Sequence, residues 1–393
     1  MTAPLYLSDL ALASCLGLDR AAHVAALFAD APPGRFIPWP GGRTLVGALP
    51  APLPPLPAAL AGFDCRNNRL LWHLAGQIMP AVTAAAARFG PDRVAVVIGT
   101  STGGIAEGEA ALAAYLAEGF WPAGFHYRQQ ELAGGAEMLA RGLGLAGPAL
   151  AVATACSSGA KAFAAARRLI RLGLADAALV GGADTLCAMT VAGFSALEAV
   201  AAGPCRPFSR DRDGITIGEG GALFLVGPDP APVALLGIGE SSDAHHVSAP
   251  DPSGRGAALA MRRALDDAGL APAAIGYLNL HGTATRLNDA MEGRAVATLF
   301  DPPPPCGSTK GLTGHTLGAA GAIEAGLAWL TLHPDWNPGR LLPLHRWDGA
   351  ADPEIPPLDL VGPGRTLAAG AAVMSSSFAF GGSNCALILG ERE

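Results

Sequence analysis

The stretch Ala151-Val-Ala-Thr-Ala-Cys156-Ser-Ser-Gly-Ala-Lys161-Ala-Phe163 decides how the rest of the chain is interpreted. Leu150 to Ala153 is a short apolar run typical of a buried strand, and the Ala-, Leu- and Arg-rich segment 160–172 is typical of a helix. Cys156 therefore stands where a strand passes into a helix. Because free N–H groups at a helix start favour negative charge, we expect its thiol to be shifted toward the nucleophilic thiolate. A small buried cysteine without a chemical role is the alternative.

Composition narrows the class of protein. Half of the 393 residues are hydrophobic and 15% are charged, so a large core can be buried. The formal net charge of −7 and the pI near 5.7 argue against a nucleic-acid binder. No run of about 18 uncharged apolar residues and no signal peptide is seen, so we expect no membrane span and a cytoplasmic location. The seven cysteines form no CxxC pair, which fits a reducing compartment.

Apolar strands alternate with helical segments along most of the chain. Strands are predicted at 94–98, 177–182, 275–280 and 385–389, and helices at 69–89, 107–145, 256–268 and 289–300, with a last long helix opened by the segment 307–324. We expect Pro80 to kink or split the first of these helices. The alternation is typical of an α/β fold with buried sheets. A break near 228 separates two similar halves, 1–228 and 229–393, which suggests an internal duplication.

Four polar residues stand in unusual surroundings. His281 follows a very apolar strand, and His315 opens a Gly- and Ala-rich helix. Ligands bind beyond the strand ends of α/β sheets, so both histidines are candidates for a site, although each could be structural. Lys310 could hold a carboxylate or keep a neighbouring imidazole neutral by repulsion. Glu324 lies in an apolar helix, and because buried carboxylates are rare unless paired, we expect Lys310 or a backbone group as its partner.

Taken together, the motifs resemble the β-ketoacyl-[acyl carrier protein] synthases of the thiolase superfamily, in particular the elongating KAS I/II type with a Cys-His-His set. The shared motifs follow the family's order: Thr154-Ala-Cys156-Ser-Ser-Gly159, Pro207-Phe-Ser-Arg-Asp-Arg-Asp-Gly214, His281-Gly-Thr-Ala-Thr285, Lys310-Gly-Leu-Thr-Gly-His315-Thr-Leu-Gly-Ala-Ala-Gly321 and Phe380-Gly-Gly-Ser-Asn384. The resemblance covers residues 94 to 390 and is much weaker before them. It implies an α/β thiolase fold, with duplicated βαβαβαββ halves in a five-layered α-β-α-β-α arrangement, normally in a dimer.

The resemblance also implies a decarboxylating Claisen condensation. Cys156 would carry the acyl group, while His281 and His315 would bind the malonyl thioester carbonyl and promote loss of carbon dioxide. Two imidazole N–H donors can stabilise the negative charge that then builds on the thioester oxygen. No metal or redox cofactor is needed, because the 4′-phosphopantetheine arm arrives on the acyl carrier protein, which is the expected partner.

Supporting roles are implied for four further residues. Lys310 and Glu324 match the pair behind the histidines. The backbone N–H groups of Cys156 and Phe380 would form the oxyanion hole, and Phe378 with Phe380 would be the aromatic pair of a gating loop.

Two features depart from the common pattern. The Gly-rich turn 99–104 lacks the Walker lysine and the Rossmann spacing, so we interpret it as a tight turn that lines a pocket. Its Thr102 occupies a place often held by an aliphatic gate or a glycine, which predicts an acyl pocket of different shape. Asp64-Cys-Arg-Asn-Asn-Arg69 and the compact length resemble synthases of aryl-polyene or related pigment pathways. Such enzymes can pair with a second synthase-like subunit, so a homodimer and a heterodimer both stay open.

Other classes of protein fit the same residues less well. A thiolase needs a second, late cysteine, and Cys385 stands in the wrong context for it. Initiating and chalcone-type synthases carry Asn where His315 stands. A cysteine hydrolase could use Cys156 and His281 but would leave the decarboxylating pair idle, and a non-catalytic chain-length subunit would usually have lost the nucleophile. A zinc site at these residues lacks any pair of ligands close in sequence.

Overall fold

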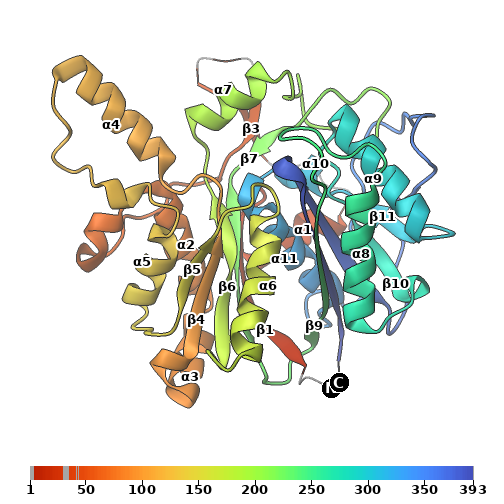
Figure 1. Ribbon diagram of the computed structural model, residues 1–393, viewed down its shortest axis with the longest axis horizontal. Helices are drawn as coiled ribbons and strands as arrows, with labels where there is room; N and C mark the ends of the chain where they lie inside the picture. Colours follow the sequence, from red (N-terminus) through yellow and green to blue (C-terminus); the bar gives the residue numbers. More distant parts are fainter. Residues whose placement is uncertain (1–3, 30–34, 41, 43, 393) are drawn as a thin grey trace.

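One mixed sheet of eleven strands crosses the molecule (Figure 1), in the order β12-β11-β10-β13-β14-β9-β1-β8-β6-β4-β5. The computed structural model describes residues 4–29, 35–40, 42 and 44–392. The strands of this sheet are β1 (Leu5–Ala13), β4 (Val94–Gly99), β5 (Ala149–Val152), β6 (Ala177–Asp184), β8 (Gly220–Gly227), β9 (Val233–Ser242), β10 (Ile275–Asn279), β11 (Pro305–Gly307), β12 (Asp359–Leu360), β13 (Ala372–Ala379) and β14 (Ser383–Glu391). A smaller sheet joins β2 (Phe36–Pro38), β3 (Leu45–Gly47) and β7 (Ile217–Gly218).

The two ends of the large sheet repeat one pairing pattern. At one end β4 pairs in parallel with β5 and β6, and β6, β8 and β1 continue antiparallel. At the other end β10 pairs in parallel with β11 and β13, and β13, β14 and β9 continue antiparallel. The two patterns meet where β1 pairs with β9. This repeat agrees with an internal duplication, while the boundary between halves 1–228 and 229–393 stays a prediction.

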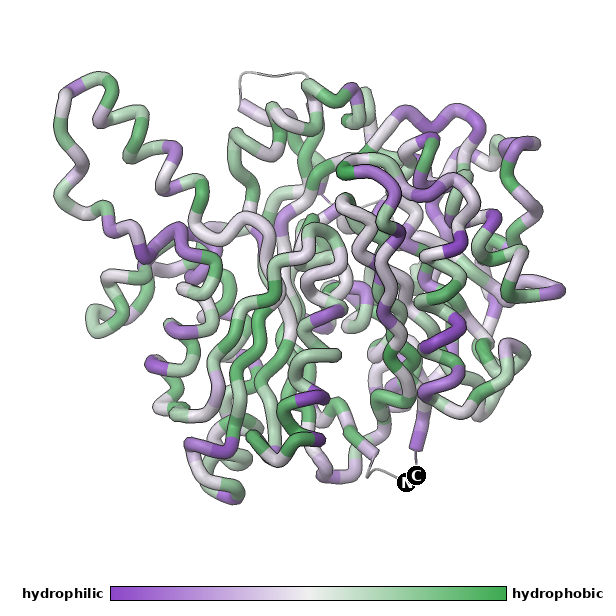
Figure 2. The backbone as a smooth tube through the Cα atoms, in the orientation of Figure 1, coloured by the Kyte–Doolittle hydropathy of each residue, from purple (hydrophilic) through white to green (hydrophobic). Residues whose placement is uncertain are grey.

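Helices cover and separate the two halves of the sheet. They are α1 (Arg20–Phe28), α2 (Arg66–Gln77), α3 (Met79–Phe89), α4 (Ile105–Glu118), α5 (Gly134–Gly142), α6 (Ser158–Arg171), α7 (Ala188–Ala196), α8 (Arg255–Ala268), α9 (Arg286–Leu299), α10 (Lys310–Thr313) and α11 (Ala320–Leu332). In separate hydrophobic clusters, α6 and α11 pack between the halves, α2, α3 and α5 cover one outer face, and α8 and α9 cover the other. The order confirms the expected five-layered α-β-α-β-α thiolase fold. In Figure 2 the hydrophobic colour follows β4 and β6, whose residues are all buried.

Two glycines let α6 and α11 cross closely. A Cβ on Gly159 would lie 2.7 Å from the backbone nitrogen of Ala322, and one on Gly321 would lie 2.7 Å from the backbone of α6. Both distances are too short for any side chain, so the helices can approach this closely only with glycine at these positions. Because Cys156 stands just before α6 and His315 shortly before α11, this crossing brings distant parts of the chain to one place.

Pro80 splits the predicted helix 69–89, as expected. The first helix ends at Gln77, the second begins at Met79, and their axes differ by 74°. Across the described residues, no single helix has the length and apolar character needed to cross a membrane, and α2 and α3 meet that test only when counted together over this bend.

Two other expectations about helices were wrong, and one helix was missed. The predicted helix 107–145 is two helices, because Gly119 with a φ of 82° ends α4 after Glu118, and α5 begins only at Gly134. The last long helix begins at Ala320, since Gly314 at a φ of 70° ends the short α10 before it. The helix α7 was missed because its sequence, Ala-Met-Thr-Val-Ala-Gly-Phe-Ser-Ala, lacks the polar and apolar spacing that marks a helix face.

Replacing Gly99 by alanine should destabilise the fold and disturb the start of α6. A Cβ at Gly99 would lie 2.5 Å from the backbone nitrogen of Gly159, so β4 and α6 would have to move apart. Overpacking of this kind typically costs about 1–3 kcal/mol. Thermal unfolding of Gly99→Ala should therefore give a lower Tm than the parent chain. Gly76→Ala is the matched control: it lies in α2 with nothing within 4 Å, and should raise stability by about 0.5–1 kcal/mol. Equal Tm values for the two variants would contradict the prediction.

Candidate active site

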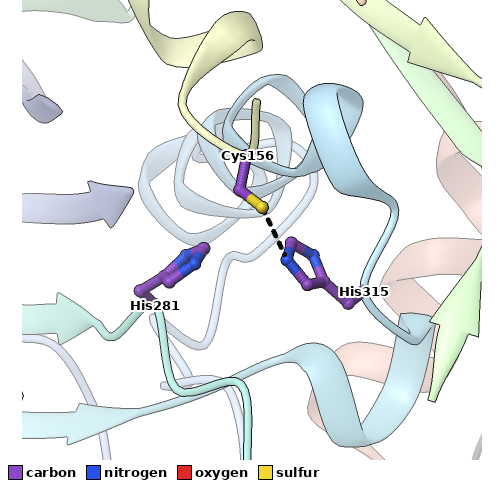
Figure 3. Close-up of side chains that lie close together, drawn as sticks. All are labelled: Cys156, His281 and His315. Carbon is purple, nitrogen blue, oxygen red and sulfur yellow. Dashed lines mark hydrogen bonds between the residues drawn. The ribbon is translucent and has the colours of Figure 1, made fainter. Parts of the chain in front are cut away.

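Cys156, His281 and His315 meet in one buried cluster (Figure 3). One nitrogen or sulfur atom from each lies within 4.8 Å of the others. The Nε2 atom of His315 is 3.1 Å from the sulfur of Cys156, and the two imidazole rings stand edge to face with centroids 5.4 Å apart. The three residues that the sequence predicts to act together are therefore neighbours, although 159 residues separate Cys156 from His315.

A strained turn presents the cysteine. Ala155, the residue before it, has a φ of +50°, which is uncommon for a residue other than glycine and costs free energy. Ser158 holds this turn, since its hydroxyl accepts a hydrogen bond from the backbone of Thr154 at 2.8 Å and donates one to the carbonyl of Ala155 at 2.6 Å. The thiol of Cys156 consequently leaves the start of α6 toward the two histidines.

The thiol of Cys156 is protonated in this state. Burial raises its pKa to about 11, although the positive charge of Lys310 and the backbone N–H groups of Phe380 and Cys156 act in the opposite direction. The expectation that the helix start would favour a thiolate is therefore wrong, because desolvation of the charge outweighs it. A proton acceptor for this thiol is already in place, since Nε2 of His315 lies within hydrogen-bond distance of the sulfur.

Lys310 fixes the protonation state of His281. Its ammonium nitrogen lies 3.2 Å from Nδ1 of His281 and donates to the carbonyl oxygen of the same residue at 2.6 Å. Because an ammonium group can only donate, Nδ1 accepts, and the neutral imidazole carries its proton on Nε2. Burial and the Lys310 charge hold the pKa of His281 and of His315 well below the usual range. Both rings are neutral at pH 7, as the sequence suggests.

Glu324 is the partner of Lys310. The two side chains are 3% and 1% exposed and form an ion pair through Oε1 of the carboxylate. Burial raises the pKa of Glu324 to about 7, against the influence of the lysine. The prediction that this carboxylate would find Lys310 is confirmed. Among the described residues, its second oxygen has no hydrogen-bond partner.

A metal ion fits this cluster poorly. Cys156, His281 and His315 could supply three ligand atoms. However, the ammonium group of Lys310 occupies the outer nitrogen of His281, where a zinc ligand normally has a carboxylate or carbonyl acceptor, and it places a positive charge beside any cation. The donor set is better suited to proton transfer than to metal binding.

A cavity of about 360 Å³ leads to the three residues. The buried ring of Phe378 lies 6.1 Å from the ring of His281, and Phe380, which is 38% exposed, rests against Phe194 at a centroid distance of 5.6 Å. Residues 381–382 follow, both glycines, with φ values of 79° and 71°. Both predicted aromatic residues therefore line the cavity, on a segment with unusual backbone freedom.

Thr102 is held away from this cavity in the part of the chain that the structure describes. Its hydroxyl and its backbone N–H both donate to the carboxylate of Asp184, at 2.8 and 2.9 Å. Thr100 and Ser101 donate to the same carboxylate. Asp184 thus fixes the whole turn after β4. The role of Thr102 in an acyl pocket stays a prediction.

Sequence reasoning missed three residues of the site. Glu292 accepts hydrogen bonds from the backbone N–H groups of His281 and Gly282, both at 2.7 Å, and burial raises its pKa to about 8. Asp184 and Phe194 are the other two. Glu292 lies in a helix with several other polar residues, so it lacked the apolar surroundings that drew attention to Glu324. Asp184 ends an apolar strand, as His281 follows one, and this shared position was the available signal.

The chain is similar to proteins of known function along most of its length. It matches the model of the beta-ketoacyl synthase N-terminal domain over residues 66–230 and that of the C-terminal domain over residues 233–341. It is 40% identical over 266 residues to the mitochondrial 3-oxoacyl-[acyl-carrier-protein] synthase of Arabidopsis thaliana, and 40% identical over 258 residues to 3-oxoacyl-[acyl-carrier-protein] synthase 2 of Mycobacterium bovis. The matches cover 62% and 60% of this chain but 57% and 60% of these relatives, less than two thirds of their length.

A solved structure extends the similarity to nearly the whole chain. This is the ketosynthase ApeO in complex with its chain length factor ApeC from Xenorhabdus doucetiae, with 44% sequence identity over 99% of this chain and 98% of that one, and a TM-score of 0.91. The resemblance inferred from the motifs is therefore confirmed. On this evidence the chain belongs to the β-ketoacyl synthase family.

Proposed function

We propose that this protein is a β-ketoacyl-[acyl carrier protein] synthase, which joins an acyl group held on Cys156 to the malonyl group of malonyl-[acyl carrier protein]. The observation that carries the proposal is the buried cluster of Cys156, His281 and His315 at the end of a cavity, with one ammonium group behind it. This condensation needs a thiol and two neutral imidazoles, one of which accepts the proton of the thiol.

The first step transfers the acyl group. Nε2 of His315 takes the proton of the Cys156 thiol, and the thiolate attacks the thioester carbonyl of the acyl-carrier protein. The tetrahedral oxyanion accepts hydrogen bonds from the backbone N–H groups of Cys156 and Phe380, both of which belong to residues that line the cavity. The carbon–sulfur bond to the carrier then breaks, and its thiol leaves with the proton from His315.

The second step removes carbon dioxide from the malonyl thioester. Its carbonyl oxygen lies between the two imidazoles, where the Nε2 proton of His281 stabilises the enolate that remains when the carbon–carbon bond breaks. After the acyl transfer His315 is neutral again, and it donates the second hydrogen bond in the tautomer that carries its proton on Nε2. The enolate carbon attacks the acyl group on Cys156, a new carbon–carbon bond forms, and the bond between the acyl carbon and the Cys156 sulfur breaks. Cys156 leaves as a thiolate that regains a proton from water, and the β-ketoacyl thioester departs on the carrier protein. Lys310 serves this step by holding the proton of His281 on the nitrogen that faces the substrate.

Carrier protein and a second subunit are the partners that we infer. The 4′-phosphopantetheine arm is supplied by the carrier, and we propose that the chain needs no resident cofactor and acts in the cytoplasm. A homodimer and a heterodimer are both compatible with α4, which extends away from the body (Figure 1) and exposes apolar residues such as Tyr115 and Leu116. The similarity to ApeO, a ketosynthase solved with its chain length factor, favours the heterodimer. The aryl-polyene kind of pathway is proposed from the segment 64–69.

Intact mass spectrometry tests the nucleophile. Mixed with a panel of acyl-carrier proteins, the purified chain should gain the mass of one acyl group, and malonyl-carrier protein should then discharge it. Cys156→Ala should show no gain, because the only attacking thiol is lost. Cys385→Ala should load and discharge as the parent does, since that thiol is fully buried on β14, where burial raises its pKa to about 12.

Three outcomes would count against the proposal. Loading on the Cys156→Ala variant would place the nucleophile elsewhere. A requirement for Cys385 would favour a thiolase. Absence of loading by the parent chain, both alone and with its co-purified partner subunit, would favour a non-catalytic chain-length subunit.

His281→Ala should separate the two steps. Loading of Cys156 should persist, because His315 is the group beside the thiol. Discharge by malonyl-carrier protein should fall by about 10²–10³, the usual effect of removing one donor to a developing oxyanion. Single-turnover loading and discharge rates provide the measurement. A variant that loses both rates equally would show that His281 has no specific part in decarboxylation.

Lys310→Met should move the acid limb of the pH profile of discharge to higher pH. The lysine lowers the pKa of both histidines, so in the parent chain they stay neutral well into acid solution. Without this charge both pKa values rise, and protonation removes activity at a pH where the parent is still active. Rates should be compared between about pH 5 and 8, the range in which histidine titrates.

Lys161→Met is the matched control, because Lys161 is the only other lysine and lies on α6, near Glu240. Its acid limb should coincide with that of the parent. Coincident profiles for the parent and Lys310→Met would contradict the assignment.

A further inference from the structure

The helix α7 is capped by a residue from another helix. Its N-cap residue, Cys187, makes no side-chain cap to the described backbone of the helix. Instead the carboxylate of Glu109, on α4, accepts hydrogen bonds from the backbone N–H groups of Ala188 at 2.9 Å and Met189 at 2.6 Å. A negative charge at this end satisfies two free donors and complements the helix dipole. The start of α7 is therefore tied to α4.

Among the described residues, little of this helix is buried. Val191 is its buried residue, packed with Ile217 and Leu317 in a small separate cluster, whereas Met189 is 54% exposed. A helix with little buried surface opens easily, so its position depends strongly on contacts at its ends.

The other end of α7 forms part of the active-site cavity. Phe194 lies in its last turn, lines the cavity and contacts the ring of Phe380 at 5.6 Å. The segment that follows, 197–199, also lines the cavity. Phe380 and Cys156 line the same cavity, so the ring contact between Phe194 and Phe380 connects α7 with the reaction centre.

We propose that Glu109 is a positioning residue for the wall of this cavity. By capping α7 it keeps Phe194 against Phe380, and so limits the bulk of the acyl groups that reach Cys156. The inference rests on the proposed function, in that an acyl group must pass through this cavity. Loss of the cap lets the helix shift and the wall retreat, which favours bulky acyl groups over small ones.

Acyl selectivity and hydrogen exchange test this role together. The variants are Glu109→Ala, Phe194→Ala, the double variant, and Glu118→Ala as a control on the same helix, for which no hydrogen bond or ion pair is found among the described residues. The ratio of loading rates from 3-methylbutyryl- and butyryl-carrier protein, which differ in branching and so in width, should rise about fivefold in Glu109→Ala, the scale of a lost helix cap. Phe194→Ala should shift it in the same direction, and the double variant should add nothing to Phe194→Ala, because both act through one contact. Glu118→Ala should leave it unchanged.

Exchange of the α7 amides gives a readout that does not need activity. It should become faster in Glu109→Ala and stay unchanged in Glu118→Ala. Unchanged exchange of the α7 amides in Glu109→Ala would overturn the inference, whether or not the parent chain loads an acyl group. Failure of the parent chain to load any acyl group would instead count against the proposed function. Normal loading by the parent with an unchanged ratio in Glu109→Ala, or with fully additive effects in the double variant, would also overturn it. A merely structural role would lower both loading rates equally.

Discussion

A single buried ammonium group controls the chemistry of this pocket. Lys310 is almost fully buried, and it contacts the imidazole and carbonyl of His281 and the carboxylate of Glu324. Taking a charge out of water is costly, and the Glu324 carboxylate offsets that cost only in part, because it is buried as well. As a result, the imidazoles of His281 and His315 both stay neutral, and the proton of His281 is held on Nε2. Burial of the Lys310–Glu324 pair therefore costs stability, and the same burial sets the protonation state of the two histidines.

The site also depends on the close crossing of α6 and α11. Gly159 and Gly321 allow α6 and α11 to approach more closely than any side chain would permit, at the centre of the five layers. This crossing explains why a thiol from one end of the sheet and imidazoles from the other converge. The strained turn at Ala155 and the carboxylate of Glu292 complete the placement on either side. Packing of the core and geometry of the site therefore depend on the same contacts.

Most of the fold could be predicted, because its signals are local. The apolar runs that became β4, β6 and β10 and the motifs around Cys156, His281 and His315 needed no tertiary information. Signals that arise only from packing were missed or misread. The thiol pKa depends on desolvation by residues distant in sequence, and the direction expected from the helix start was wrong. The contacts of Asp184 with the turn 100–102 likewise exist only after β4 and β6 have paired.

The scarcity of lysine limits how readily the protein can be acylated on its amines without a catalyst. The thioesters that the proposed function requires can acylate free amines without any enzyme. The chain has two lysines, and one of them, Lys310, is sealed inside the pocket with its ammonium group fully paired. The remaining basic residues are mostly arginines, whose guanidinium groups stay protonated and are poor nucleophiles. The side chain of Lys161 is only 16% exposed and lies 4.0 Å from Glu240, so neither lysine is openly presented to a thioester or to an amine-directed label.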